Sequence, residues 1–341
     1  MKNLLENAAR RAATYLENLP SRSVAPREQA VAKLREFHEP LPDDPSSAES
    51  VLEMLDAIGS PATMAMAGPR FYGFVVGGSL PVCLASNWLA GAWDQNSALY
   101  NVTPATAVLE QVALQWLLDL FRLPADCAGS FVTGATMANF CSLAAARHAV
   151  LARAGWDVEA DGLFGAPPIT VVVGEEAHPS LIKSLGLLGL GRTRVLRVSV
   201  DGQGRMRADA LPSLAEPAIV CLQAGNVNTG AFDPFEAVCP QAREAGAWIH
   251  VDGAFGLWAA TVPDLQHLVR GIEQADSWAT DTHKWLNVPY DSGLAIVRDG
   301  DALRAAMSVT ASYLPTVTEH RNPSDYTPEF SRRARGVERS E

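Results

Sequence analysis

The stretch AWIHVDGAFG, residues 247–256, predicts a buried strand that ends in a carboxylate. The residues before Asp252 are mostly apolar on both faces, which is typical of a sheet that helices cover on both sides. The two small residues after Asp252 leave room for a ligand. A carboxylate in this place needs a cationic or hydrogen-bonded partner, unless it only caps the next turn.

Other short runs of β-forming residues alternate with helical stretches along the chain. These runs are 169–174, 194–198, 218–223, 277–280 and 293–297, and a long helix that begins at a proline is predicted for 104–123. Strands separated by helices indicate an α/β fold with a mostly parallel sheet flanked by helices. Ligands of such folds bind at the carboxyl ends of the strands, so the residues after each run are the first candidates for a site.

Lysine is rare in this chain. Of the 27 basic residues among its 341, only those at positions 2, 33, 183 and 284 are lysines. Lys284 lies in DTHKWLNVPYDSG, residues 281–293, between a histidine and a tryptophan. An amine can lose its proton where water is excluded and then attack a carbonyl, whereas a guanidinium stays protonated. The alternative is a partly exposed lysine whose stem lies along Trp285.

The overall composition indicates an acidic globular protein. The formal net charge is −11 and no basic stripe is concentrated anywhere, so nucleic acid is not expected as a partner. The N-terminus lacks the apolar segment of a signal peptide, and no apolar window is long enough for a membrane span. Five scattered cysteines favour buried thiols over disulfides or a cysteine zinc site, and no other metal site is indicated. We therefore expect a cytoplasmic location.

The chain is expected to have three parts. Residues 1–60 are predicted to form an N-terminal helical arm, with breaks at LPSRSVAPRE and EPLPDDPSSAES. The large domain is expected at 61–320. Residues 321–341 are polar at their end and are expected to be the start of a shortened C-terminal region.

A small-residue turn opens a helix in FVTGATMANF, residues 131–140. The free backbone N–H groups at such a helix start bind phosphate, and Thr133 and Thr136 offer hydroxyl donors. The alternative is an ordinary helix cap. His178 follows the run at 169–174, where its imidazole can stack on an aromatic ring, move protons, or only cap the next helix.

These candidates follow one another as phosphate turn, histidine, aspartate and lysine. Together they suit a cofactor with a phosphate, a flat cationic ring and an aldehyde, which is pyridoxal 5'-phosphate. A nicotinamide dinucleotide fits less well, because the glycines of GLLGLG, 186–191, do not open a helix after a strand.

From about residue 70 to residue 335 the chain resembles the pyridoxal-phosphate-dependent group II amino acid decarboxylases, such as the aromatic amino acid and glutamate decarboxylases. DTHKWLNVPYDSG is similar to the family's N-P-H-K-W or D-A-H-K-W signature, and HVDGAFG and FVTGATMANF are nearly as specific. The resemblance implies an aspartate-aminotransferase-like large domain (fold type I) with a seven-stranded type of sheet. It also implies a homodimer with active sites at the subunit interface. The implied reaction removes the α-carboxylate of an L-amino acid, here expected to be aromatic or apolar, to give an amine and carbon dioxide.

The same resemblance implies roles for single residues. Lys284 is expected to bond the cofactor's aldehyde, Asp252 to pair with the ring nitrogen and His178 to stack on the ring. The other cofactor contacts that we expect are Thr133, Gly134, Ala135 and Thr136 in a phosphate cradle, His283 as a second phosphate contact, and Ala254 beneath the ring.

Two further groups of residues are expected near the substrate. The family takes the proton for Cα from a loop tyrosine or from the stacked histidine, and the loop region here offers Tyr313 and Tyr326. A pocket for an aromatic or apolar side chain can be lined by Phe71, Phe74, Trp93 and Tyr100, although each also fits a core or interface position.

Other functions fit parts of the pattern. An aminotransferase, an aldolase or another enzyme of the same cofactor shares Asp252 and Lys284, but in a different local sequence. Family members usually continue past the SRRAR element, 331–335, into a C-terminal domain. The sequence therefore also fits a shortened remnant that binds the cofactor without turnover.

Overall fold

The computed structural model describes residues 1–309 and 320–339 of the chain. It divides into two compact units, Met1–Gly78 and Ser79–Glu341. Tyr313, one of the predicted proton donors, lies outside the described residues. None of the described helices has the length and apolar character that crossing a bilayer requires.

The N-terminal unit is helical. Its helices are α1 (Lys2–Asn18), α2 (Glu28–Lys33), α3 (Ala48–Met54) and α4 (Ser60–Ala62), with short irregular turns of helix at Leu34–Phe37 and Leu55–Gly59. The side chain of Ser47 accepts a hydrogen bond from the Ser50 N–H and so caps α3. None of the residues of α1, α2 or α3 is fully buried, which is typical of an arm.

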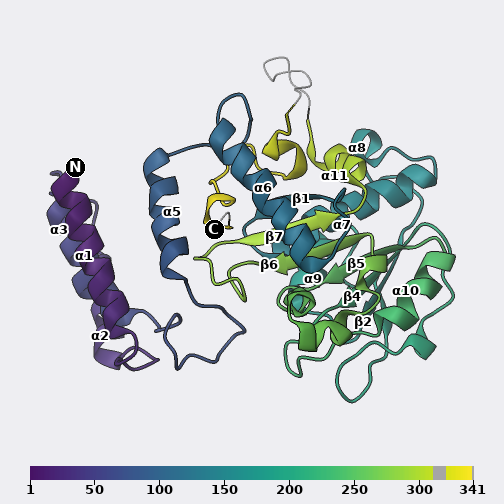
Figure 1. Cartoon of the computed structure of the whole chain (residues 1–341), viewed down its shortest axis with the longest axis horizontal. Helices are drawn as coiled ribbons and strands as arrows, with labels where there is room; N and C mark the ends of the chain where they lie inside the picture. The colour runs from purple at the N-terminus through teal and green to yellow at the C-terminus, as the bar shows by residue number, and fades with distance from the viewer. Residues whose placement is uncertain (310–319, 340–341) are drawn as a thin grey trace. The chain divides into compact units, whose positions relative to one another are not determined.

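The second unit is built on a seven-stranded sheet (Figure 1). Its strands are β1 (Ala128–Val132), β2 (Thr170–Gly174), β3 (Leu196–Val198), β4 (Ala218–Gln223), β5 (Trp248–Asp252), β6 (Ser277–Asp281) and β7 (Gly293–Val297). Their order is β1-β7-β6-β5-β4-β2-β3. Strand β7 is antiparallel to both of its neighbours, whereas the other pairs are parallel.

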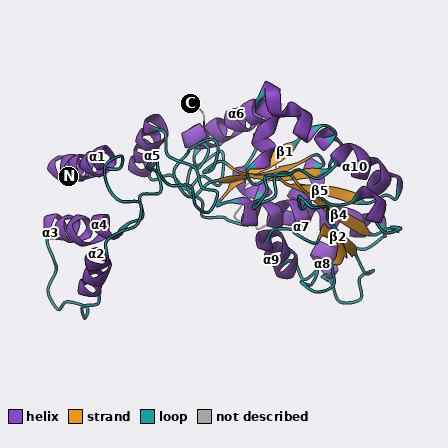
Figure 2. Ribbon diagram, turned by 90° about the horizontal axis from the view of Figure 1, so that it is seen from below, coloured by secondary structure: helices purple, strands orange, loops and turns teal. Residues whose placement is uncertain are grey.

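Helices cover both faces of this sheet (Figure 2). One apolar layer packs α7 (Ala135–Arg153), α9 (Pro179–Leu187) and α11 (Gly300–Met307) on one face. The opposite layer packs α6 (Pro104–Phe121) and α10 (Phe235–Glu244) on the other. The remaining helices are α5 (Pro81–Trp93) and α8 (Val158–Asp161), with short 3-10 turns at Ala208–Ala210, Gly256–Thr261, Pro263–Val269, Ile272–Gln274, Pro323–Tyr326 and Val337–Arg339.

The predicted α/β architecture is confirmed. Each of the runs predicted as a strand overlaps one of β2 to β7, and the long helix begins at Pro104 as expected. The run at 194–198 contributes only Leu196–Val198, at the edge of the sheet, where one neighbour is missing. The apolar residues on both faces of the central strands are therefore explained by the two helical layers.

A buried ion pair holds the C-terminal segment against α6. Arg332 and Glu110 are almost fully buried, at 0% and 1% side-chain exposure, and their Nη1 and Oε2 atoms lie 3.0 Å apart. Arg332 also donates hydrogen bonds to the carbonyl oxygens of Ser97 at 2.8 Å and Phe131 at 2.9 Å. A second cation, Arg321, lies 3.3 Å from the same carboxylate. This arrangement links α6, β1 and the segment after residue 320.

We expect the Glu110→Ala substitution to destabilise the protein by about 3–5 kcal/mol, because it leaves a buried guanidinium without its counter-charge. Urea unfolding of the variant and the parent protein measures this difference. Glu159→Ala is the matched control, since Glu159 pairs with Arg147 near the surface and should contribute less than about 1 kcal/mol. Equal losses in both variants would contradict a special role for the buried pair.

Candidate functional site

Most of the predicted site residues gather at one edge of the sheet. Strands β1, β2, β4, β5 and β6 run in the same direction, so their carboxyl ends meet at this edge, together with the start of β7. The residues that follow these ends are Thr133 and Gly134 after β1, His178 after β2, Gln223 at the end of β4, Asp252 at the end of β5, and Asp281, His283 and Lys284 at and after β6.

Asp252 is a buried carboxylate that faces α7. It accepts hydrogen bonds from Nδ2 of Asn139 at 3.0 Å and from the backbone N–H of Ala254 at 3.2 Å. Burial raises the pKa of Asp252, while the hydrogen bond from Asn139 and the nearby charges of His178 and Lys284 lower this pKa. A carboxylate in so dry a place is suited to a cationic ligand group.

Lys284 turns its amine toward a second buried carboxylate. Its Nζ lies 2.9 Å from Oδ2 of Asp281, and 6.0 Å from the centre of the Phe255 ring. Its side chain is 19% exposed, which leaves the amine partly accessible from solvent. The amine is thus held between a carboxylate and an aromatic ring at the same strand edge as Asp252.

The predicted phosphate cradle is occupied by the chain's own carboxylate. Oδ1 of Asp281 accepts the backbone N–H of Ala135, the first residue of α7, at 2.6 Å and lies 3.4 Å from Nε2 of His283. A Cβ on Gly134 would lie 3.2 Å from the same oxygen. One on Gly293 would lie only 2.5 Å from the Gly134 Cα, so glycine is required for this close approach. The cradle is therefore already a place that binds an anion.

His178 caps the helix α9 at this edge of the sheet. Its Nδ1 accepts the backbone N–H of Ser180 at 3.2 Å at the start of α9, and lies 2.7 Å from the Ser180 hydroxyl. His178 therefore does cap α9, which is the alternative to a cofactor role. Its imidazole remains exposed, and its charge lowers the pKa of Asp252. Capping fixes the ring's position, which also suits a stacking role.

The other predicted cofactor contacts also lie at this edge. His283 stacks on Tyr290 with ring centres 4.2 Å apart, and its Nδ1 accepts the Ser292 N–H at 3.0 Å. Ala254 joins the ends of β5 and β6, since its carbonyl accepts the Asp281 N–H at 2.9 Å. Thr133 and Thr136 flank the cradle and are half-buried.

The predicted proton donor and substrate residues are less closely tied to the site. Tyr326 packs against the layer of α7 and α11, with the Arg321 guanidinium 4.3 Å from its ring centre. Tyr100 stacks on His320, with ring centres 3.9 Å apart. Trp93, at the end of α5, is 44% exposed. Phe71 and Phe74 belong to the N-terminal unit. None of the contacts described for these residues includes Lys284 or Asp252, so their roles stay predictions.

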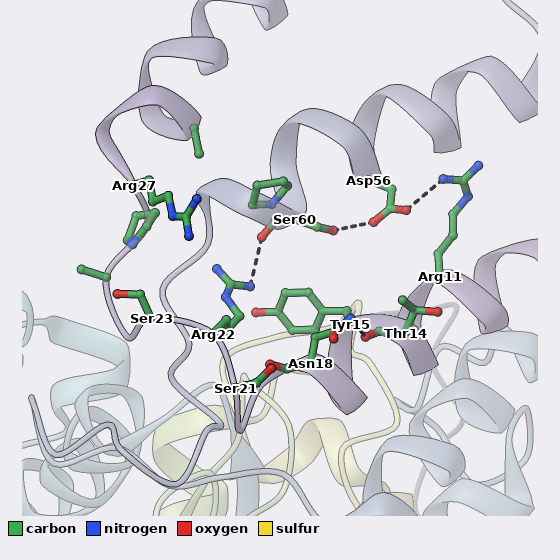
Figure 3. Close-up of a pocket in the computed structure, with 14 residues that line it drawn as sticks. Arg11, Thr14, Tyr15, Asn18, Ser21, Arg22, Ser23, Arg27, Asp56 and Ser60 are labelled. Atoms are coloured by element: carbon green, nitrogen blue, oxygen red, sulfur yellow. Dashed lines mark hydrogen bonds and ion pairs between the residues drawn. The ribbon is translucent and has the colours of Figure 1, made fainter.

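A separate hollow of about 490 Å³ lies within the N-terminal unit (Figure 3). Arg11 and Arg22 point into it from α1 and the following loop, but both are engaged by the unit itself. Arg11 pairs with Asp56 at 2.8 Å, and Arg22 donates to the Ser60 carbonyl at 3.2 Å. None of the predicted site residues lines this hollow.

Sequence reasoning missed three polar residues at the edge of the sheet. Asp281 lies three residues before Lys284 in the quoted stretch, and Asn139 is an amide within an apolar helical run; both are visible signals in the sequence. Gln223 pairs in register with Asp252 and lines the same small cavity of about 10 Å³. The buried carboxylate of Asp233 accepts the N–H groups of Gln223 and Met206, each at 2.7 Å, and so fixes the end of β4.

A family model described as the pyridoxal-dependent decarboxylase conserved domain matches residues 32–338. The chain belongs to this family. Tryptophan decarboxylase 1 of Oryza sativa subsp. japonica is 28% identical over 270 residues, which cover 73% of this chain and 52% of that protein. Acidic amino acid decarboxylase GADL1 of Mus musculus is 29% identical over 255 residues, or 72% and 46% of the two chains. The chain thus spans about half the length of these relatives.

A crystal structure of Oryza sativa TDC with PLP and tryptamine has the same fold. It superposes with a TM-score of 0.88 at 24% identity, over 99% of this chain and 72% of that one. The aspartate-aminotransferase-like fold predicted for this decarboxylase-family chain is therefore confirmed, and so is pyridoxal phosphate as the cofactor of the family. The roles of the single residues remain predictions.

The geometry of the edge fits this cofactor. The cradle at the start of α7 already binds the Asp281 carboxylate as a stand-in for a phosphate oxygen. Lys284 provides the amine, and Asp252 provides a buried anion for a protonated ring nitrogen. One feature opposes binding, because a phosphate in the cradle would meet the negative charge of Asp281.

We expect the Asp281→Asn substitution to strengthen the binding of pyridoxal phosphate about tenfold more than it strengthens the binding of pyridoxal. The reason is that the substitution removes a like charge near the phosphate. Both ligands carry the aldehyde that Lys284 is predicted to bond, so loss of the Lys284 ion pair affects both. The ratio of the two dissociation constants, measured by absorbance titration, isolates the phosphate contribution. An unchanged ratio would show that Asp281 does not face the phosphate.

Asp233 gives a prediction for the pH dependence of stability. Burial raises the pKa of Asp233 to about 6 from the ordinary value of 3.8. The folded protein therefore holds this proton more tightly than the unfolded chain, and its stability falls as pH rises from about 4 to about 6. Relative to Asp233→Asn, the parent protein should lose about 2 kcal/mol of unfolding free energy between pH 4 and pH 7. Urea unfolding across this range measures the difference, and a constant difference would contradict it.

Proposed function

We propose that the protein is a decarboxylase that converts an L-amino acid with an aromatic or apolar side chain into an amine and carbon dioxide. The observation that carries this proposal is the meeting of Lys284, Asp252 and the α7 cradle at one edge of the sheet. Family membership supports the reaction, and the name of the rice relative supports an aromatic substrate. The mouse relative makes an acidic amino acid the competing substrate class.

When bound, pyridoxal phosphate supplies a ring that accepts the electron pair released as the Cα–carboxylate bond breaks. The residues of this chain position that chemistry. The Lys284 amine would bond the aldehyde carbon of the cofactor. Asp252 would hold a proton on the ring nitrogen, and the N–H groups at the start of α7 would hold the phosphate.

A proton must replace the lost carboxylate at Cα. His178 is the candidate at the described site, because it is exposed, fixed by its cap on α9 and placed after β2 at the same edge of the sheet. Tyr326 packs beside α11 and serves only if its segment moves toward the cofactor. We therefore assign the proton to His178 and keep Tyr326 and Tyr313 as the alternatives.

We also propose a cytoplasmic homodimer. Large apolar side chains on α5 are about half exposed, namely Trp88, Leu89 and Trp93, and a second copy of the chain would cover such a surface. All five cysteines are buried free thiols, which suits a reducing compartment.

Covalent attachment of the cofactor to Lys284 tests the proposal. After incubation with pyridoxal phosphate and borohydride reduction, mass spectrometry should find the cofactor on Lys284 in the parent protein and not in Lys284→Ala. Lys183→Ala is the matched control, because Lys183 is an exposed lysine on α9. Attachment elsewhere, or none, would refute the cofactor site.

Carboxyl-labelled amino acids then test the reaction. Aromatic substrates should release labelled carbon dioxide and amine in equal amounts, and the Lys284→Ala variant should lose this activity by at least about a thousandfold. A ketoacid product would favour the aminotransferase alternative. Binding of the cofactor on Lys284 without release of product from any amino acid would favour cofactor binding without turnover.

A further inference from the structure

A chain of buried hydrogen bonds lies behind Asp252. Trp248, His250 and Asp252 alternate along β5, so their side chains lie on the face of the sheet that α7 covers. Ser277, at the start of β6, and Asn139, in the second turn of α7, lie between them. These polar side chains lie in an otherwise apolar layer of the protein.

Four contacts of similar length connect these side chains. The indole N–H of Trp248 donates to the Ser277 hydroxyl at 2.9 Å, and the same hydroxyl lies 2.9 Å from Nδ1 of His250. Nε2 of His250 lies 2.9 Å from Oδ1 of Asn139, whose Nδ2 donates to Asp252 at 3.0 Å. Asn139, His250 and Ser277 are completely buried, at 0% exposure.

The two ends of this chain determine the direction of every bond. An indole nitrogen can only donate, and an ionised carboxylate can only accept. Asn139 must therefore present its NH₂ group to Asp252 and its oxygen to His250, so Nε2 of His250 carries the proton. Nδ1 is then an acceptor for the Ser277 hydroxyl proton. In each of the four hydrogen bonds the donor therefore lies on the Trp248 side and the acceptor on the Asp252 side.

His250 can keep this state over the working range of pH. Burial lowers the pKa of His250 to about 3, so the imidazole stays neutral and donates from one nitrogen only. Burial of Asp252 acts in the opposite sense and raises the pKa of that carboxylate. The hydrogen bond from Asn139 is the largest of the effects that oppose protonation of Asp252.

We propose that Asn139, His250 and Ser277 form a positioning relay that holds Asp252 ionised and oriented toward the ring nitrogen of the cofactor. The relay rests on the proposed function, since it acts through the contact between Asp252 and that nitrogen. Aligned hydrogen bonds polarise one another, so the outer members strengthen the last bond without touching the cofactor. The three residues are positioning residues, and Asp252 is the group that makes the contact.

The imidazole of His250 gives the first test, which needs neither a variant nor the cofactor. Nitrogen NMR of the ¹⁵N-histidine-labelled protein should show a protonated Nε2 and an unprotonated Nδ1 for the His250 ring. A proton on Nδ1 would reverse the direction of the chain and overturn the proposal. Because this measurement is independent of cofactor binding, it separates failure of the relay from failure of the proposed function.

Asn139→Leu provides the second test, because it removes the last donor while keeping the branched shape of the side chain. In the cofactor-loaded protein, a ¹⁵N-labelled pyridine ring should lose its nitrogen proton, and kcat should fall about 10- to 100-fold, with KM changed less than about twofold. Ser142→Ala is the control, because Ser142 is equally buried on α7 and lies outside the relay. A ring nitrogen that stays protonated in Asn139→Leu would overturn the proposal.

A double-mutant cycle tests whether the relay extends beyond Asn139. Ser277→Ala should lower kcat severalfold in the parent protein, but should have no further effect in the Asn139→Leu background, because the path to Asp252 is already broken. Within the described part of the chain, Ser277 and Asn139 are each hydrogen-bonded to His250 and not to one another, so such coupling must pass through His250. The connected relay would be refuted if Ser277→Ala changed kcat no more than Ser142→Ala does. It would also be refuted if the effects of Ser277→Ala and Asn139→Leu on kcat were additive in the double variant.

Discussion

The burial of one carboxylate, Asp252, is the constraint that organises the centre of this structure. A carboxylate at the end of an apolar strand is costly to desolvate, and it persists only where donors and positive charge surround it. Here Asn139 and the Ala254 N–H donate to it, and the charges of Lys284 and His178 lie near it. Strand β5 can end in a charge because α7, β6 and the loop after β2 supply these groups.

Helix α7 connects the two halves of the proposed cofactor site. Its first residue, Ala135, gives its N–H to the cradle, and Asn139, one turn later, contacts Asp252. Both ends of a bound pyridoxal phosphate would thus be set by one rigid helix, whose spacing is fixed at 1.5 Å per residue. The close contact of Gly134 with Gly293 holds the start of this helix against β7, so the distance between phosphate and ring positions does not depend on a loop.

Much of the fold could be predicted from sequence, because strands buried on both faces have a simple apolar signature. Asp252, Lys284 and the turn before Ala135 could also be found, since strand ends in such folds converge. The relay could not, because the pairing of Asn139 with His250 depends on the register of a helix over a sheet. The pattern did not show that Asp281 would enter the cradle either, since a carboxylate near a lysine usually indicates only an ion pair. For aromatic residues such as Trp93, the sequence does not distinguish a side chain that lines a substrate pocket from one that lies in a subunit interface.

Asp281 connects the start of α7 with Lys284. A helix start presents N–H groups without intrahelical partners, and a lysine amine gains from a nearby carboxylate. The Asp281 carboxylate satisfies Ala135 and Lys284 at once. A phosphate at this helix start would compete with the Asp281 carboxylate for the Ala135 N–H. The two sides of the proposed site therefore differ in charge, because Asp252 offers a buried anion to a cationic ring, whereas the start of α7 already pairs with an anion of the chain itself.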